Sequence, residues 1–313
     1  MLEMTNAVIN EVKKVVKGKD EIIQKVLMAI YASGHVLLED NPGSGKTTLA
    51  KAFSHAIELD YKRQQFTPDT MPSDIIGYSY FDKMSNEMKF MEGSVQCNLL
   101  LGDEINRTSA KTQAALLQAM EEKAITVEGI TYPLPDPFIV IATQNPVTSL
   151  GTQPLPDSQC DRFIVKLSMG YPEIADEVNI LKETSVFDIT TRVDTVMSKE
   201  NLIAIRQYVD SSIYASDEML DYICRLCDAT RKDQYIDVGV STRGAIAMKR
   251  MACANALLCN RNYIIPDDVY AIFIDVCAHR IILKPQAKLE DINEETILMR
   301  ILNEVKPPVL ARY

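Results

Sequence analysis

The chain has 313 residues, of which 47% are hydrophobic, and its formal net charge is −10, from 43 acidic and 33 basic residues. This length predicts about two domains with a sizeable core, and the composition argues against a disordered chain and against nucleic-acid binding through overall charge. Because no run of about 18 apolar residues is free of charge and the N-terminus has no secretory-type apolar segment, we expect a cytoplasmic protein without membrane insertion.

The first predicted helix and strand lead into a glycine-rich loop. Residues 20–33 carry apolar side chains at helical spacing and predict a helix that ends at Gly34. Residues 35–39 are nearly all apolar, as expected of a strand buried on both faces of a parallel sheet. A glycine loop at 43–45 and a predicted helix over 47–57 follow. Phosphate binding requires this order, because N–H groups of the loop and of the helix N-terminus then point at the anion.

The glycine loop resembles the pattern G-x-x-x-x-G-K-[ST]. Gly45, Lys46 and Thr47 match its end, whereas Asp40 stands where the pattern has its first glycine. Since Asp tolerates unusual backbone angles, we interpret Asp40 as a variant exit from the strand. Lys46 would reach the β- and γ-phosphates, and the Thr47 hydroxyl would bind Mg²⁺. The residues expected to contact the nucleotide here are Asn41, Pro42, Gly43, Ser44, Gly45, Lys46, Thr47 and Thr48. The alternative, a plain glycine and serine turn with a surface lysine, does not account for the flanking strand and helix.

Two adjacent carboxylates end another apolar segment. Residues 62–66 predict a strand and residues 67–90 an insertion, and the apolar run within 98–107 then leads into Asp103 and Glu104. Open α/β sheets place their ligands at the carboxyl ends of strands. There Asp103 can hold the Mg²⁺ shell and Glu104 can polarise a water for attack on the γ-phosphate. A solvated acidic turn is the alternative interpretation, and the phosphate loop argues for the functional one.

A helix, a hairpin and two strands complete the predicted sheet region. Ser109 caps a predicted helix, and a hairpin is predicted around Gly129. Strands are predicted at 138–143, which ends next to Asn145, and within 161–169. Five short strands that alternate with helices indicate an open, mostly parallel α/β sheet.

The character of the sequence changes near residue 183. Residues 183–198 are polar and aperiodic, which is typical of a linker. Helices are then predicted near 199–209, 217–231, 242–259, 266–280 and 291–304. We therefore divide the chain into a core at 1–184, a linker at 185–198 and a small all-helical domain at 199–313.

Six stretches resemble the AAA+ ATPases of the MoxR family, in the same order and at similar spacing. They are GHVLLEDNPGSGKTTLAKA, FTPDTMPSDIIG, NLLLGDEINRTSAKTQAALLQAMEE, ATQNP, PLPDSQCDRF and GVSTRGA. The resemblance covers nearly the whole chain. It implies an αβα nucleotide-binding core followed by a helical lid, hydrolysis of ATP to ADP with Mg²⁺, and a homo-oligomeric ring, usually a hexamer, with ATP between subunits.

The resemblance also implies roles for single residues. Asn145 matches the first sensor, which helps to orient the attacking water, and Arg243 matches the second sensor, which carries the nucleotide state into the lid. Arg162 matches the arginine finger, whose guanidinium spreads charge compensation over the neighbour's transferring phosphoryl group. Arg107 and Lys111 stay open as competing cations for that position in trans.

Other matching segments are expected around the base and at the ring's pore. Val16 and Gly18 match the N-terminal segment that approaches the adenine, although a plain loop before the helix is an equal alternative. Residues 73–95 and 125–134 match an insertion and a hairpin that face the pore or a partner.

The function implied is an ATPase that remodels or matures other proteins in a chaperone-like manner. The resemblance associates such proteins with partners that carry von Willebrand factor A domains. A nucleotide-dependent scaffold with low turnover and a nucleic-acid motor are the alternatives. The motor predicts a basic stripe or a DNA-binding module, neither of which we find in the sequence.

Overall fold

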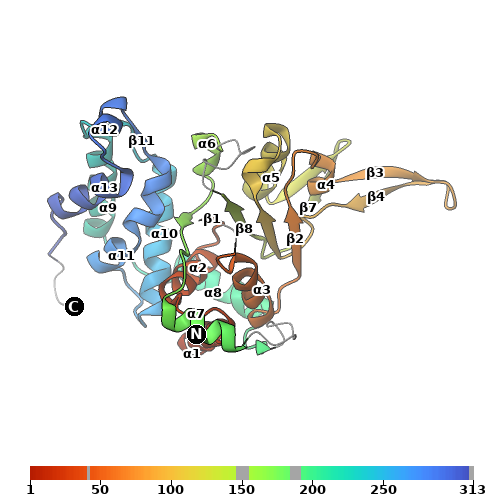
Figure 1. Cartoon of the computed structure of the whole chain (residues 1–313), viewed down its shortest axis with the longest axis horizontal. Coiled ribbons are helices and arrows are strands. Elements are labelled where there is room, and N and C mark those ends of the chain that lie inside the picture. Colours follow the sequence, from red (N-terminus) through yellow and green to blue (C-terminus); the bar gives the residue numbers. More distant parts are fainter. Residues whose placement is uncertain (41–42, 146–154, 184–191, 310–313) are drawn as a thin grey trace.

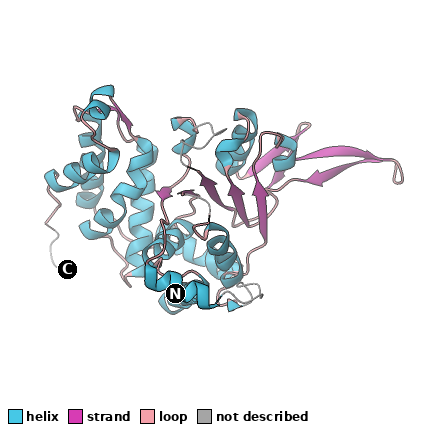
Figure 2. Ribbon diagram, in the orientation of Figure 1, coloured by secondary structure: helices cyan, strands magenta, loops and turns pink. Residues whose placement is uncertain are grey.

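The computed structural model describes residues 1–40, 43–145, 155–183 and 192–309. In this part of the chain a five-stranded parallel sheet lies between helices, and the helices of the C-terminal third pack beside it (Figure 1, Figure 2). The strand order is β2-β5-β8-β1-β9. The bounds are β1 (Val36–Glu39), β2 (Tyr61–Gln65), β5 (Leu99–Asp103), β8 (Ile139–Gln144) and β9 (Val165–Leu167). The predicted fold class is confirmed, although β9 is shorter than the segment 161–169 suggested.

Both faces of the sheet are buried, which explains why its strands lack an alternating pattern. In β1, Val36 and Leu38 join one hydrophobic cluster and Leu37 joins the other. All residues of β5 and β8 are buried. Because successive side chains point to opposite faces, a strand that is covered on both sides needs apolar residues throughout.

Helices cover the sheet on each side. The cluster on one face includes α1 (Leu2–Val15), α2 (Asp20–Tyr31) and α3 (Lys46–Ala56), and the cluster on the other includes α5 (Ala110–Glu122). Ser109 caps α5 by accepting a hydrogen bond from the backbone N–H of Thr112, as the sequence predicts. The sequence analysis does not predict α1, although its Val8 and Val12 are buried at helical spacing.

Two hairpins leave the sheet region on the same side. After α4 (Pro72–Ile76), β3 (Gly77–Asp82) and β4 (Glu87–Glu92) form an antiparallel ribbon that extends away from the body of the molecule (Figure 1). The predicted hairpin around Gly129 consists of β6 (Ala124–Val127) and β7 (Ile130–Pro133). Phe90 and Tyr132 stack with their ring centroids 4.2 Å apart, so the two hairpins contact each other.

The C-terminal third is helical, as predicted. Its described helices are α8 (Lys199–Ser211), α9 (Asp217–Lys232), α10 (Thr242–Leu258), α11 (Pro266–Cys277), α12 (Pro285–Leu289) and α13 (Glu294–Glu304). Ser198, Ser216, Ser241 and Asn293 each cap the helix that follows by accepting a backbone hydrogen bond. The short strands β10 (Ile236–Val238) and β11 (Ile282–Leu283) pair with each other and are not predicted from the sequence.

The helical domain packs directly on the core. One hydrophobic cluster runs from α1 and α2 into α8, α10 and α11, and the ion pair between Lys25 and Asp275, 2.6 Å long, joins α2 to α11. Within residues 192–198, Val193 and Met197 are buried in this same cluster. The domain boundaries at 184 and 199 stay predictions. Among the helices of the described ranges, none has the length and apolar character needed to span a bilayer.

Candidate functional site

The backbone of the glycine loop adopts conformations that favour glycine. Gly43 has φ 87° and Gly45 has φ 89°, and Gly45 is the N-cap of α3. A Cβ atom on Gly43 would meet nothing within 4 Å. The hydroxyl of Ser44 is buried and has no hydrogen-bond partner among the described residues. The loop therefore offers open space and an unused donor at a helix N-terminus. Asn41 and Pro42 lie outside the described residues.

Lys46 lies in a negatively charged environment. Its side chain is buried, and its Nζ donates a 2.7 Å hydrogen bond to the backbone carbonyl of Asp40. Burial lowers the pKa of Lys46, while the nearby carboxylates, among them Asp103 and Glu104, act in the opposite direction. The lysine of the glycine loop and the two carboxylates of the β5 end are thus close enough to interact electrostatically, as the sequence predicts. Thr47 and Thr48 follow Lys46 in the first turn of α3 and are half-buried.

Asp40 has a different role from the one that the sequence suggests. It is not among the residues with positive φ in the described part of the chain, so its backbone conformation does not explain the departure from glycine. Instead, its carboxylate accepts hydrogen bonds from the Ser168 hydroxyl at 2.8 Å, the Gly170 backbone N–H at 3.0 Å, and the Met169 backbone N–H. The side chain therefore ties the start of the glycine loop to the segment that follows β9.

The Asp103 carboxylate is held by two side chains from neighbouring strands. The Thr143 hydroxyl, on β8, donates a 2.7 Å bond to Asp103 Oδ1 and accepts a 2.9 Å bond from the Glu104 backbone N–H. The Arg63 guanidinium, on β2, contacts Asp103 Oδ2 at 2.7 Å. One hydroxyl thereby fixes both acidic residues at the carboxyl edge of the sheet.

Glu104 is the centre of a polar cluster at that edge. It has φ 56°, which turns the chain directly after β5. Its Oε1 accepts a 2.9 Å bond from Asn145 Nδ2, and its Oε2 accepts bonds of 2.7 Å from Arg107 and 3.0 Å from Gln65. The structure thus brings Asn145 to Glu104, as expected of a side chain that orients a water near this carboxylate. Arg107 pairs with Glu104 of its own chain.

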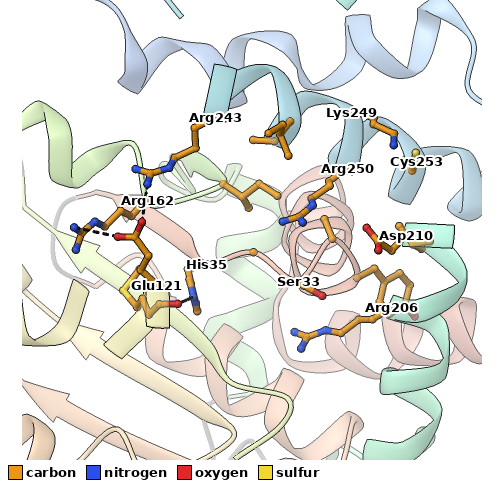
Figure 3. Close-up of a pocket in the computed structure, with 18 of the residues that line it drawn as sticks. Ser33, His35, Glu121, Arg162, Arg206, Asp210, Arg243, Lys249, Arg250 and Cys253 are labelled. Atoms are coloured by element: carbon orange, nitrogen blue, oxygen red, sulfur yellow. Dashed lines mark hydrogen bonds and ion pairs between the residues drawn. The ribbon is translucent and has the colours of Figure 1, made fainter. Parts of the chain in front are cut away.

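Arg162 and Arg243 meet at a different place. Both contact the carboxylate of Glu121, in the last turn of α5, at 3.1 Å and 2.7 Å (Figure 3). Arg243 also lies 3.5 Å from Asp161. Among the contacts of the described residues, neither arginine touches Lys46 or Glu104. The two arginines therefore form a pair of their own, contributed by the core and the lid.

The arginine pair lines a cavity of about 660 Å³ between the core and the helical domain. Its basic residues outnumber its acidic ones, in contrast to the chain as a whole. The basic residues are Lys123, Arg162, Arg206, Arg243, Lys249, Arg250 and Arg280, and the acidic ones are Glu121, Asp136, Asp161 and Asp210. An anion that approaches the pair meets a positive local field.

Of the two residues expected near the base, Gly18 lies against the start of α7 (Ile174–Glu183). Val16 is buried, and Gly18 has φ 65°. A Cβ atom on Gly18 would lie 2.0 Å from an Asp176 carboxylate oxygen, so this contact requires glycine. Lys19 Nζ donates a 2.8 Å bond to the Tyr171 carbonyl. The structure thus brings the segment with Gly18 and the segment with Tyr171 together.

Sequence analysis does not identify several residues of these clusters. Arg63, Gln65 and Thr143 depend on the strand order, since the register that pairs Gln65 with Asp103 exists only when β2 lies beside β5. In the sequence, Glu121 is one of two adjacent acidic residues near the end of a predicted helix, and nothing marks it as a partner of the two arginines. Within the described ranges, no group of three or more His, Cys, Asp or Glu side chains could hold a metal ion by itself.

Comparisons with known proteins agree with this geometry. Residues 35–165 match the family model described as "ATPase family associated with various cellular activities (AAA)", and residues 228–301 match the model of the AAA lid domain. The chain is 44% identical over 301 residues to the uncharacterized protein YeaC of Bacillus subtilis, a match that covers 96% of this chain and 94% of that protein. It is 35% identical over 307 residues to Chaperone MoxR1 of Mycobacterium tuberculosis, covering 95% of this chain and 81% of that protein. The crystal structure of an ATPase candidate from Cytophaga hutchinsonii superposes with a TM-score of 0.91 at 37% identity and covers 98% of this chain and 96% of its own.

Proposed function

The chain belongs to the MoxR family of AAA ATPases and is itself an ATPase, and from this premise we propose that it couples Mg²⁺-dependent ATP hydrolysis to the remodelling or maturation of partner proteins. The observation that carries the proposal is that Lys46, at the start of α3, lies within electrostatic reach of Asp103 and Glu104 at the carboxyl end of β5 and directly follows a glycine loop with an unused hydroxyl. This arrangement suits a nucleoside triphosphate because it joins donors for the phosphates to a carboxylate that can act on water.

We assign phosphate binding to residues 41–48. The N–H groups of the loop and of the first turn of α3 donate to the phosphate oxygens, and the Lys46 ammonium neutralises the β- and γ-phosphates. When ATP is bound, Lys46 exchanges part of its contact with the Asp40 carbonyl for the phosphate oxygens. Val16 and Gly18 then border the adenine from the N-terminal side.

Thr47 and Asp103 are the residues that would hold Mg²⁺. A hydroxyl at a helix start and a carboxylate at a strand end are hard oxygen ligands, and Mg²⁺ in nucleotide sites takes one or two such protein ligands together with phosphate oxygens. When bound, the ion neutralises charge on the phosphates. Arg63 and Thr143 hold the Asp103 carboxylate in place and fix its orientation.

We assign water activation to Glu104 and Asn145. The remaining lone pair of Glu104 Oε1 accepts a hydrogen bond from the water that attacks the γ-phosphate, and Asn145 holds the carboxylate at the correct angle through its 2.9 Å bond to the same oxygen. The bonds from Gln65 and Arg107 to the second oxygen of Glu104 restrain the side chain further.

Arg162 and Arg243 are proposed to act on the nucleotide of a neighbouring subunit. Two guanidinium groups that converge on one carboxylate can converge on a γ-phosphate instead, because both anions offer oxygens in a similar geometry. Glu121 then compensates part of the charge of the pair in the absence of that phosphate. Arg107, which pairs with Glu104 of its own chain, and Lys111, which is exposed on α5, stay the competing candidates for this role.

A site shared between subunits requires an oligomer, and we propose a hexameric ring. The name of the relative Chaperone MoxR1 supports a chaperone-like role for the work done by this ring. The client is a protein, with von Willebrand factor A domains as the first class to test. The exposed side chains of the β3–β4 ribbon, among them Phe81, Met84 and Met88, offer apolar contacts for such a client.

ATP hydrolysis measured over a series of protein concentrations tests the shared site. We expect the specific rate of the parent to rise with concentration, and Arg162→Ala to bind ATP normally but to lose the concentration-dependent part. Lys111→Ala is the matched control and keeps it. A parent rate that does not depend on concentration contradicts the shared site.

The client assignment needs a separate experiment. Glu104→Gln, which is expected to bind ATP without cleaving it, serves as a trap, and proteins that co-purify with it are compared with and without ATP. Retention of the same protein in both conditions, or of none in either, contradicts an ATP-driven remodelling cycle.

A further inference from the structure

We propose that Arg280, in the helical domain, is a positioning residue that holds Arg162 and Arg243 in the geometry with which they reach a neighbour's nucleotide. The inference rests on the proposed function of the arginine pair and extends it to a residue that does not touch the nucleotide. Its basis is the set of contacts that Arg280 makes with the two segments that carry the pair.

Arg280 lies in a short helical turn after α11 and its side chain is 2% exposed. All five of its N–H donors have acceptors, four of them in the core segment 161–164. These acceptors are Asp161 Oδ1 at 2.8 Å, the Asp161 carbonyl at 3.2 Å, the Phe163 carbonyl at 2.7 Å and the Ile164 carbonyl at 3.1 Å, and the fifth is the Val276 carbonyl of the helical domain itself.

Arg162 lies inside the segment that Arg280 grips. The carbonyl before Arg162 and the carbonyl after it both accept from Arg280 Nη2. The backbone of Arg162 is therefore fixed on each side by one planar guanidinium group. His279 adds to this grip, since its Nε2 lies 3.0 Å from the Phe163 carbonyl.

The same side chain supports Arg243. A Cβ atom on Gly244, the residue after Arg243, would lie 3.0 Å from Arg280 Cδ, so the first turn of α10 packs directly on the Arg280 stem. Asp161 links Arg280 to Arg243 electrostatically, because its Oδ1 accepts a hydrogen bond from Arg280 while its Oδ2 lies 3.5 Å from Arg243. Arg280 thus contacts the segments on which both Arg162 and Arg243 are carried.

The chemistry of this position favours arginine over lysine. Burial lowers the pKa of Arg280, and Asp161 is among the groups that favour its charged form. A lysine could keep the charge, but its ammonium is one point with three donors and cannot bridge the carbonyls at both sides of Arg162. Arg280→Lys should therefore leave the charge and remove the alignment.

The expected effect on the rate of ATP hydrolysis is large because the Arg162 guanidinium acts only when it is correctly positioned at the neighbour's γ-phosphate. A misplacement of about 1 Å in a positioned catalytic group can cost about 100-fold in rate. We expect Arg280→Lys to reduce ATP hydrolysis by about this factor, with ATP affinity unchanged, since Lys46 and Thr47 of the same subunit are not altered.

Mixing two inactive variants provides the test. A Glu104→Gln subunit cannot hydrolyse ATP but has an intact arginine pair, and an Arg280→Lys subunit has intact Lys46 and Glu104. We expect a mixture of the two to hydrolyse ATP at least about tenfold faster than either alone, as it supplies correctly held arginines to competent sites. The reference is a mixture of Arg162→Ala with Glu104→Gln. The control is Arg261→Lys, which alters the ion pair between Arg261 and Asp268 elsewhere in the helical domain and should hydrolyse ATP at the parent rate.

The outcomes separate this inference from the proposed function. The inference is overturned if Arg280→Lys hydrolyses ATP at the parent rate. It is also overturned if Arg280→Lys is inactive and mixing with Glu104→Gln restores ATP hydrolysis to Arg162→Ala but not to Arg280→Lys. If neither variant is restored, the shared site itself is wrong and the inference falls with it. Should Arg280→Lys not fold, Asp161→Asn replaces it in the same mixtures, because it weakens the contacts with Arg280 and Arg243 at a side chain that is 21% exposed. Restoration of Asp161→Asn is then the supporting result, and its absence beside a restored Arg162→Ala overturns the inference.

Discussion

Replacing Asp40 with alanine should destabilise the protein and weaken ATP binding together. The carboxylate accepts three hydrogen bonds from the segment 168–170, two of them from backbone N–H groups. A hydrogen bond to a charged group contributes about 1.5–3 kcal/mol, and a buried donor left unpaired costs about 1–3 kcal/mol. Because Gly170 is exposed and water can replace part of its bond, we expect a loss of about 3 kcal/mol in the free energy of unfolding.

The same change reaches the nucleotide through Met169. Its Cε lies 3.8 Å from the position of a Cβ on Gly45, so the segment that Asp40 restrains packs against the glycine loop. Without the tether formed by the bonds of Asp40 to residues 168–170, the glycine loop loses more conformational entropy when it binds phosphate, and the affinity for ATP falls.

Urea denaturation and calorimetric titration with ATP measure both effects of Asp40→Ala. Asp40→Asn, which retains a carbonyl acceptor, should lose less stability than Asp40→Ala. Glu39→Ala is the matched control, since the Glu39 carboxylate makes partly exposed contacts with Lys166 and Gln144 and should contribute less than the three bonds of Asp40. If Asp40→Ala unfolds at the same urea concentration as Glu39→Ala, the tether does not stabilise the loop and the interpretation of Asp40 is wrong.

Two further predictions follow from the described contacts. Thr143→Val should lower the free energy of unfolding by about 2 kcal/mol and slow ATP hydrolysis, because the Asp103 carboxylate and the Glu104 N–H both lose the hydroxyl that they share. Thr143→Ser keeps that hydroxyl and should retain both the stability and the rate of the parent, as measured by denaturation and by ATP hydrolysis. Burial lowers the pKa of His35 to about 4 from its usual 6.5, so its contribution to stability is complete above pH 6.5 and is lost as the pH falls toward 4, a change of about 3 kcal/mol. Unfolding curves at a series of pH values should show this loss and should flatten in His35→Asn, which keeps an acceptor but does not titrate. Burial also lowers the pKa of His279, so part of the loss should persist in that variant.

Either of these two predictions can fail clearly. Equal rates for Thr143→Val and Thr143→Ser contradict a role for the hydroxyl in holding the two acidic residues. A pH dependence in His35→Asn as steep as in the parent shows that other groups cause the acid instability.

The sequence predicts those parts of the molecule whose chemistry is local. Two short stretches of sequence contain the glycine loop with Lys46 and Thr47 and the two carboxylates at the end of β5. The chemistry of each stretch can be inferred from its own residues, without knowledge of the fold. The sheet is predictable for the same reason, since buried parallel strands are short apolar runs bounded by helices. Strand β9 begins later than predicted because the carbonyls of residues 161, 163 and 164 bond to Arg280 of the helical domain, and it ends at Leu167 because Ser168 and Met169 bond to the Asp40 carboxylate.

The remaining features depend on contacts between distant residues. Glu121 contacts both Arg162 and Arg243, and it is 122 residues from Arg243 along the chain. The register of β2 likewise brings Gln65 beside Asp103. Asp40 shows how a correct observation can receive a wrong reason. Its departure from glycine is visible in the sequence, but the explanation lies in its bonds to the segment after β9 rather than in its own backbone angles.

The most direct test of the central claim compares ATP binding and ATP hydrolysis in Glu104→Gln. The amide has almost the same shape as the carboxylate but cannot accept a proton from water, and removing a positioned base typically costs a factor of about 10² to 10⁴ in rate. We therefore predict ATP affinity close to that of the parent and hydrolysis at least about 100-fold slower. A variant that hydrolyses ATP as fast as the parent would contradict the assignment of Glu104, and with it the proposed mechanism of the site.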